Sequence, residues 1–318
     1  MERWRLMIQE FFKGAAAWLA VVMLVSFPAG CTRQEAARQP AAAPGEKRFP
    51  VKGQVVSVDR ERGTLLVDHE EIPGYMPAMA MEFAVSPGDL ANATEGRRLQ
   101  AELVEEDAAP GEAGAAPVLR LEKVWYVDEV ADARVAAAAD ALRQDTSIRG
   151  RGAYREIGEN LPGFTLYNQK GEAVSADRFR GKKIVLNFIY TRCPIDTMCP
   201  ASTRNMKTVQ EKAKAAGVTN LELISISFDP EHDTPGVLRD YAEAHGIDTG
   251  NFSLLTGPER AIKDLLRQFG VIASERDGPI IKHSLSTLLI NEQGRIVWRA
   301  DGSGWNPDDF VERLKGGA

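Results

Sequence analysis

The sequence predicts two folded parts, a small all-β barrel followed by a larger α/β domain. Five short strands fall within residues 48–128, and several of them alternate apolar with polar residues, which is typical of a small barrel. From residue 159 onward, apolar strands alternate with amphipathic helices, which is typical of a sheet covered by helices. A pair of cysteines lies between a buried strand and a helix of this second part.

Composition limits the classes of function. The formal net charge of −6 gives no support to nucleic-acid binding, and no basic stripe is present. Three cysteines in 318 residues are too few for a disulfide-rich scaffold. The chain is long enough for two domains with an N-terminal extension.

The first 31 residues have the pattern of a secretory signal. Basic residues precede an uncharged run over residues 14–27, and small residues lead to Ala29-Gly30-Cys31. This ending resembles a bacterial lipoprotein cleavage site, which implies lipidation at Cys31. An uncleaved membrane anchor is the alternative. Both interpretations make the remainder extracytoplasmic (periplasmic) and membrane-anchored, with residues 32–47 as a disordered linker.

The elements of the barrel follow in order. Residues 53–58 and 64–68 flank a polar turn and predict a hairpin. Met79, Met81, Phe83 and Val85 alternate with less apolar residues, as on a half-buried strand. Residues 98–105 and 118–127 are the remaining candidate strands. Five strands in about 80 residues predict a barrel of the OB type over residues 48–128.

A helical linker is expected at 129–158, with a helix over 131–144 and a polar segment over 145–158. The larger domain occupies 159–318. Strands are predicted at 164–167, 184–189, 221–228, 252–255, 286–290 and 296–300, and helices at 201–216, 235–245, 258–269 and 307–315. Residues 291–294 join the last two strands as a hairpin. A sheet of this order with a terminal antiparallel hairpin is thioredoxin-like.

Cys193 and Cys199 lie on the loop between the strand at 184–189 and the next helix. Backbone N–H groups and the helix dipole favour a thiolate at such a position. Two thiolates there can perform redox chemistry, hold a soft metal, or do both. A buried disulfide without function is the alternative. The Cys-x-x-Cys spacing of thioredoxin-like reductases is absent.

Three motifs of this domain resemble the SCO/SenC family. They are Thr191-Arg192-Cys193-Pro194 with Cys199-Pro200, the stretch from Asp229 to Pro235, and Lys282-His283-Ser284. The resemblance covers residues 160–314 and implies a thioredoxin-fold copper chaperone that helps to assemble the binuclear copper centre of cytochrome c oxidase. Five residues separate the two cysteines here, whereas three are commonest in the family.

The resemblance implies a ligand set of Cys193, Cys199 and His283. Two sulfurs and one imidazole suit Cu(I) and can also hold Cu(II). His283 follows Gly278-Pro279 and is predicted to open a strand. Asp229 is expected in an outer-shell role, orienting the histidine or tuning the thiols; its alternative is a turn carboxylate. His232 and His245 are expected at the surface.

The stretch from His69 to Phe83 resembles the metal-binding segment of CusF, a periplasmic copper and silver carrier. His69, Met79 and Met81 fall on that family's ligand positions, and Met76 stands where CusF has a tryptophan. Thioethers select soft monovalent metals. The alternative is that these methionines fill the barrel core.

The sequence therefore predicts an extracytoplasmic copper chaperone with two soft-metal sites. Its expected partners are the membrane, through the N-terminal anchor, and the oxidase subunit that carries the binuclear copper site. The alternative is an enzyme, a thiol–disulfide reductase whose redox-active Cys193 and Cys199 keep the oxidase's or another partner's cysteines reduced.

Overall fold

The computed structural model describes residues 47–106, 118–150, 152–277 and 280–316. The predicted signal, Cys31 and nearly all of the predicted linker therefore lie outside the described residues. Within the described ranges, no helix is both long and apolar enough to cross a membrane.

The first folded part is a closed barrel with strand order β1-β2-β3-β5-β4. Antiparallel pairing of β1 with β4 and a short parallel contact between β3 and β5 close the ring. Inward-facing Val67, Phe83 and Leu103 are fully buried and form part of its core. The five predicted strands are confirmed, with bounds β1 Arg48–Asp59, β2 Thr64–His69, β3 Met79–Ala84, β4 Arg98–Glu106 and β5 Val118–Tyr126.

A short helix, α1 (Pro87–Asn92), connects β3 to β4. The sequence pattern does not predict it, because six residues are too few to show helical periodicity. Its start is nevertheless encoded locally. The Ser86 hydroxyl accepts a hydrogen bond from the Asp89 backbone N–H at 3.1 Å, and Pro87 occupies the first turn.

Helix α2 (Glu129–Arg149) is longer than predicted. The sequence places its end at Gln144, yet the helix continues for five more residues. The hydroxyls of Thr146 and Ser147 donate to helix carbonyls four residues earlier, which accommodates polar residues in the last turns. The Gln268 amide also donates to Asp145 and Thr146, so a long-range contact holds a segment that looks like a loop in the sequence.

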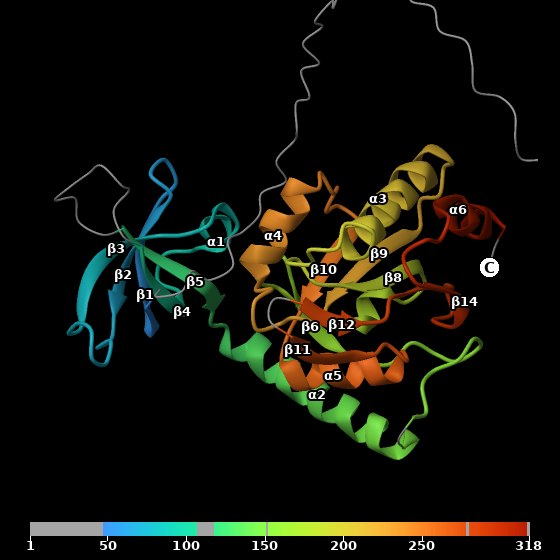
Figure 1. Cartoon of the computed structure of the whole chain (residues 1–318), viewed down its shortest axis with the longest axis horizontal. Coiled ribbons are helices and arrows are strands. Elements are labelled where there is room, and N and C mark those ends of the chain that lie inside the picture. Colours follow the sequence, from blue (N-terminus) through green and yellow to red (C-terminus); the bar gives the residue numbers. More distant parts are fainter. Residues whose placement is uncertain (1–46, 107–117, 151, 278–279, 317–318) are drawn as a thin grey trace, which may run out of the picture. The chain divides into compact units, whose positions relative to one another are not determined.

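The second folded part is built on a seven-stranded sheet of order β14-β13-β8-β9-β10-β6-β7 (Figure 1). Strands β8, β9 and β10 are parallel, and the strands on either side of them pair antiparallel. The three central strands are almost entirely buried, which explains their continuous apolar sequences. The predicted thioredoxin-like architecture is confirmed. The bounds are β6 Thr165–Asn168, β7 Ala173–Ser175, β8 Lys183–Ile189, β9 Leu221–Ser227, β10 Phe252–Thr256, β13 Ser286–Ile290 and β14 Ile296–Asp301.

Helices cover both faces of this sheet. Helix α3 packs against α6 and α2 packs against α5, and Figure 1 shows the two pairs on opposite sides of the sheet. Prolines occupy the first turns of three of these helices, where a missing N–H is harmless. The bounds are η1 Ala176–Phe179 (a 3₁₀ turn), α3 Cys199–Ala215, α4 Pro235–Ala244, α5 Glu259–Gln268 and α6 Pro307–Lys315.

A separate two-stranded ribbon carries His283. Strands β11 (Ala273–Asp277) and β12 (Ile280–His283) pair antiparallel, with Ala273 opposite His283. The prediction that His283 opens a strand is wrong, because His283 is the last residue of β12. Two hydrogen bonds between Ile272 and Ser284 extend the pairing past the end of the ribbon and fix where the histidine leaves it.

Candidate metal centre

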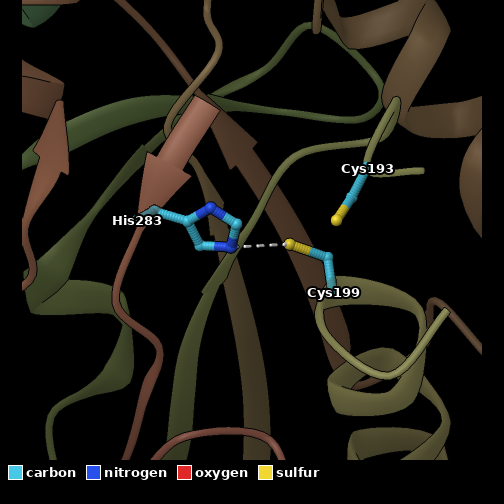
Figure 2. A group of neighbouring side chains, drawn as sticks. All are labelled: Cys193, Cys199 and His283. Carbon is cyan, nitrogen blue, oxygen red and sulfur yellow. Dashed lines mark hydrogen bonds between the residues drawn. The ribbon is translucent and has the colours of Figure 1, made fainter. Parts of the chain in front are cut away.

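Cys193, Cys199 and His283 meet at one point of the second folded part (Figure 2). One donor atom from each residue lies within 4.8 Å of the others, and the Cys199 Sγ lies 3.5 Å from the His283 Nε2. Metal–sulfur and metal–nitrogen bonds of roughly 2.0–2.3 Å place a single ion's ligand atoms at most about 4.6 Å apart. The three donors are thus close to the spacing that one ion requires.

Different elements supply the three donors. Cys199 is the first residue of α3, where unpaired backbone N–H groups point toward the loop. Cys193 follows β8 by four residues. Both thiols are free and buried, whereas Pro194 to Thr197 between them are exposed. The longer loop therefore projects into solvent without displacing either sulfur from the cluster.

The two cysteines are electrostatically unequal. Hydrogen bonding from the Cys199 thiol, aided by the backbone at Ile195 and Cys199, lowers the pKa of Cys193 to about 5. Burial, together with the charge on Cys193, raises the pKa of Cys199 far above its ordinary value. At neutral pH Cys193 is the thiolate of the pair and Cys199 keeps its proton. This difference in protonation between the two cysteines suits both metal capture and nucleophilic attack by Cys193.

A backbone group and two aromatic rings hold the His283 side chain. Its Nδ1 lies 2.7 Å from the Ile281 carbonyl oxygen, which leaves Nε2 directed at the sulfurs. The Phe228 and Tyr190 rings pack against the imidazole with centroids at 4.6 and 5.4 Å. The backbone thus orients the imidazole, which is one of the two roles expected of Asp229.

The Asp229 carboxylate lies next to the cysteine loop. It is buried and forms an ion pair with Arg192 at 2.8 Å, directly before Cys193. The outer-shell role of Asp229 remains a prediction, and this contact favours an influence on the cysteine loop. His232 is half-buried rather than at the surface, and burial followed by the charge of Arg192 lowers its pKa to about 4. His245 is also half-buried, against Tyr241.

Asp233 is a residue of the site that the sequence did not single out. Its carboxylate accepts hydrogen bonds from the Thr191 backbone N–H at 3.1 Å, the Thr191 hydroxyl at 2.5 Å and the Ser227 hydroxyl at 2.5 Å. Its side chain is fully buried. It therefore ties the end of β9 to the residues that lead into Cys193. Only its position within the Asp229–Pro235 motif could have indicated from the sequence that Asp233 belongs to the site.

A cleft borders the cluster on its His283 side. A cleft of about 430 Å³ is lined by His283 and Met198 together with serines, Arg299 and Asp301. Since Cys193 is 8% exposed and Cys199 is not exposed, this cleft is an approach by which a ligand can reach the cluster past the imidazole.

Three of the candidate barrel donors lie on one face of the β2–β3 pair. His69 pairs with Met79 and Val67 with Met81 in the β2–β3 register, so His69, Met79 and Met81 share one face. The His69 ring is 2% exposed, and its Nδ1 lies 2.7 Å from the Glu70 carbonyl oxygen. Its Nε2 is buried without a hydrogen-bond partner among the described residues. Met79 is 44% exposed, while Met76 and Met81 are partly buried against the barrel core.

Two protein families match the two folded parts. The SCO1/SenC family matches residues 154–317, and the family of the copper-binding periplasmic protein CusF matches residues 48–112. The SCO1 protein homolog of Bacillus subtilis is 31% identical over 156 residues, which cover 48% of this chain and 79% of that protein.

Solved structures also resemble the second part. BsSco, described with a disulfide switch and as a member of the Sco family of cytochrome c oxidase assembly proteins, is 28% identical with a TM-score of 0.46; the match covers 52% of this chain and 96% of that one. ScoI of Bradyrhizobium japonicum, solved with copper bound, is 28% identical with a TM-score of 0.43; the match covers 51% of this chain and 100% of that one.

Proposed function

The chain belongs to the SCO1/SenC family, and from this premise we propose that it is an extracytoplasmic copper chaperone that delivers copper to the binuclear centre of cytochrome c oxidase. Copper is the metal that the chain binds, as the two copper-binding families and the Cys–Cys–His cluster indicate. The observation that carries the proposal is the convergence of three soft donors within 4.8 Å. We expect Cys193, Cys199 and His283 to be the ligands.

The donor set suits a carrier. Sulfur and imidazole bind Cu(I) strongly, and their replacement by a partner's thiolates is a ligand exchange that needs no electron transfer. The buried sulfurs protect the ion from solvent, and the cleft beside His283 leaves one side for an incoming ligand. Delivery would then begin with exchange of His283, the most exposed donor of the three.

The barrel is proposed to collect Cu(I) through His69, Met76, Met79 and Met81. The buried and unpartnered His69 Nε2 supports this role, because burying a polar nitrogen without a partner is costly. A metal bound there would satisfy it. Copper is expected to pass from these thioethers to the thiolates of the second site, which bind Cu(I) more strongly.

Replacing Met81 by leucine tests the barrel site. The two side chains have similar volumes, so the fold is expected to persist while the affinity of the barrel for Cu(I) falls about tenfold or more, roughly 1.4 kcal/mol. Titration with a competing Cu(I) chelator measures this change. Met206→Leu, which alters a fully buried methionine of α3, is the matched control and should leave copper binding unchanged. Equal affinities of the Met81 variant and the parent chain would assign Met81 to the barrel core.

The alternative function is thiol–disulfide reduction. The unequal cysteines favour it, because a thiolate at Cys193 is a nucleophile and Cys199 lies close enough to resolve a mixed disulfide. In that case copper binding would be incidental.

His283→Ala separates the two functions. A carrier should lose Cu(I) affinity by more than the roughly 10–100-fold typical of outer-shell changes, because a direct ligand is removed. Reduction of a disulfide-containing oxidase peptide should change little, since Cys193 and Cys199 remain. Chelator competition and the peptide assay are measured on the same preparations.

The matched control is His245→Ala, which removes an imidazole that packs on Tyr241 instead of facing the sulfurs. If oxidase assembly in cells proceeds normally with the His283 variant while its copper affinity is lost, the reductase function replaces the carrier.

A further inference from the structure

A buried tyrosine hydroxyl lies next to the proposed copper ligands. Tyr190 directly follows β8 and is 1% exposed. Its hydroxyl oxygen is fully buried and has no partner at full hydrogen-bond geometry among the described residues, although the Cys193 side chain and the Ile281 backbone lie close enough to interact with it. Buried hydroxyl groups are normally paired, so the neighbouring Cys193 sulfur is the natural acceptor for this one.

The surroundings of Tyr190 point to the metal centre. Its ring meets the His283 imidazole edge-on at 5.4 Å, and its carbonyl oxygen accepts a hydrogen bond from the Cys193 backbone N–H at 3.4 Å. Burial raises the pKa of Tyr190, and the negative charge of Cys193 raises it further. The hydroxyl therefore lies between the His283 imidazole and the loop that carries the Cys193 sulfur.

We propose that Tyr190 is a positioning residue whose hydroxyl donates a hydrogen bond to the Cys193 sulfur when that sulfur binds copper, and that it thereby favours Cu(I) over Cu(II). This inference rests on the proposed copper site. The hydroxyl already lies within reach of the Cys193 sulfur, which would remain its acceptor if that sulfur held copper.

The two oxidation states of copper differ in how much electron density they take from sulfur, and this difference determines which state the hydrogen bond favours. A hydrogen bond withdraws electron density from the sulfur and weakens its donation to copper. Cu(II) depends on that donation more than Cu(I) does, so the reduction potential rises. The hydroxyl is thus expected to keep the carried ion in the reduced state that thiolate exchange requires.

Tyr190→Phe removes the hydroxyl and keeps the ring that packs on His283. In the full chain, the preference for Cu(I) over Cu(II) should fall about tenfold, a decrease in potential of about 59 mV for one electron. The sulfur-to-Cu(II) charge-transfer band should move to lower energy. The number of Cu(I) ions bound should not change. Redox titration, absorption spectroscopy and metal analysis measure these quantities.

Tyr167→Phe is the matched control, because it removes a buried tyrosine hydroxyl that is bonded to Asp132 at 2.5 Å. It should leave potential and spectrum unchanged, and thermal unfolding of both variants reports any loss of stability. An unchanged potential and band in the Tyr190 variant would overturn the inference while leaving the copper site intact. Loss of a phenolate-to-Cu(II) band would also overturn it, since Tyr190 would then be a ligand. Absence of copper binding by the parent chain would refute the proposed function itself.

Discussion

Replacing both Cys193 and Cys199 by serine is expected to reduce the copper content of the fully loaded chain from two Cu(I) ions to one. The serine hydroxyl is a hard, protonated donor that binds Cu(I) poorly, so His283 would remain as a lone imidazole. The barrel donors are unaffected, because His69 and the methionines belong to a separate fold with its own core. Metal analysis after loading with Cu(I) under reducing conditions and desalting measures the content.

The Cys31→Ser variant is the control for this experiment. It removes the third cysteine, which lies outside the described residues and outside both proposed sites, and should retain two ions. A further variant that combines Cys193→Ser, Cys199→Ser and Met81→Leu should bind copper weakly. Retention of two tightly bound ions by the double cysteine variant would remove the second site from the proposal.

Asp233→Ala is expected to lower the free energy of unfolding by about 3–5 kcal/mol at pH 7. The substitution leaves the Thr191 N–H and the hydroxyls of Thr191 and Ser227 without their acceptor in a buried environment. It also frees the segment that leads into Cys193, so Cu(I) affinity at the second site should fall. Urea unfolding and chelator titration report the two effects separately.

The same carboxyl predicts a dependence of stability on pH. Burial, reinforced by the negative charge of Asp229, raises the pKa of Asp233 from 3.8 to about 6. Between these values the folded state keeps a proton that the unfolded state has lost. Stability from this group is therefore complete below about pH 4 and falls as pH rises through 6, by up to about 3 kcal/mol.

Asp233→Asn isolates this contribution. The amide cannot ionise, so the difference in unfolding free energy between this variant and the parent should shift in favour of the variant from pH 4 to pH 8. The comparison with the parent chain is needed because burial also raises the pKa of Asp89, to about 7. Asp89 therefore also makes the stability of the parent chain fall as pH rises.

Asp196→Ala is the matched control. Its exposed ion pair with Arg204 of α3 should contribute less than about 1 kcal/mol. A parallel pH profile for the parent and the Asp233→Asn chain would contradict the assignment.

Local patterns predicted most of the fold. The central strands β8 to β10 are continuous apolar runs, and prolines and glycines mark the helix boundaries, so their positions are readable without tertiary information. The ribbon of β11 and β12 was missed because Ala273 to Asp277 is mostly polar and lacks strand periodicity. The last turns of α2 were missed because a contact from Gln268 holds them.

The sequence by itself determined the two folded parts, the paired cysteines at a helix start and the candidate donors His283, His69 and the methionines, because donor type and helix position are local properties. Only the tertiary structure decided that Cys193 and Cys199 differ in pKa and that the Ile281 carbonyl group holds the His283 imidazole. It also decided that Asp233 and Tyr190 face the cysteine loop. These features depend on burial and on contacts between groups far apart in the chain. A local sequence pattern encodes neither burial nor such contacts.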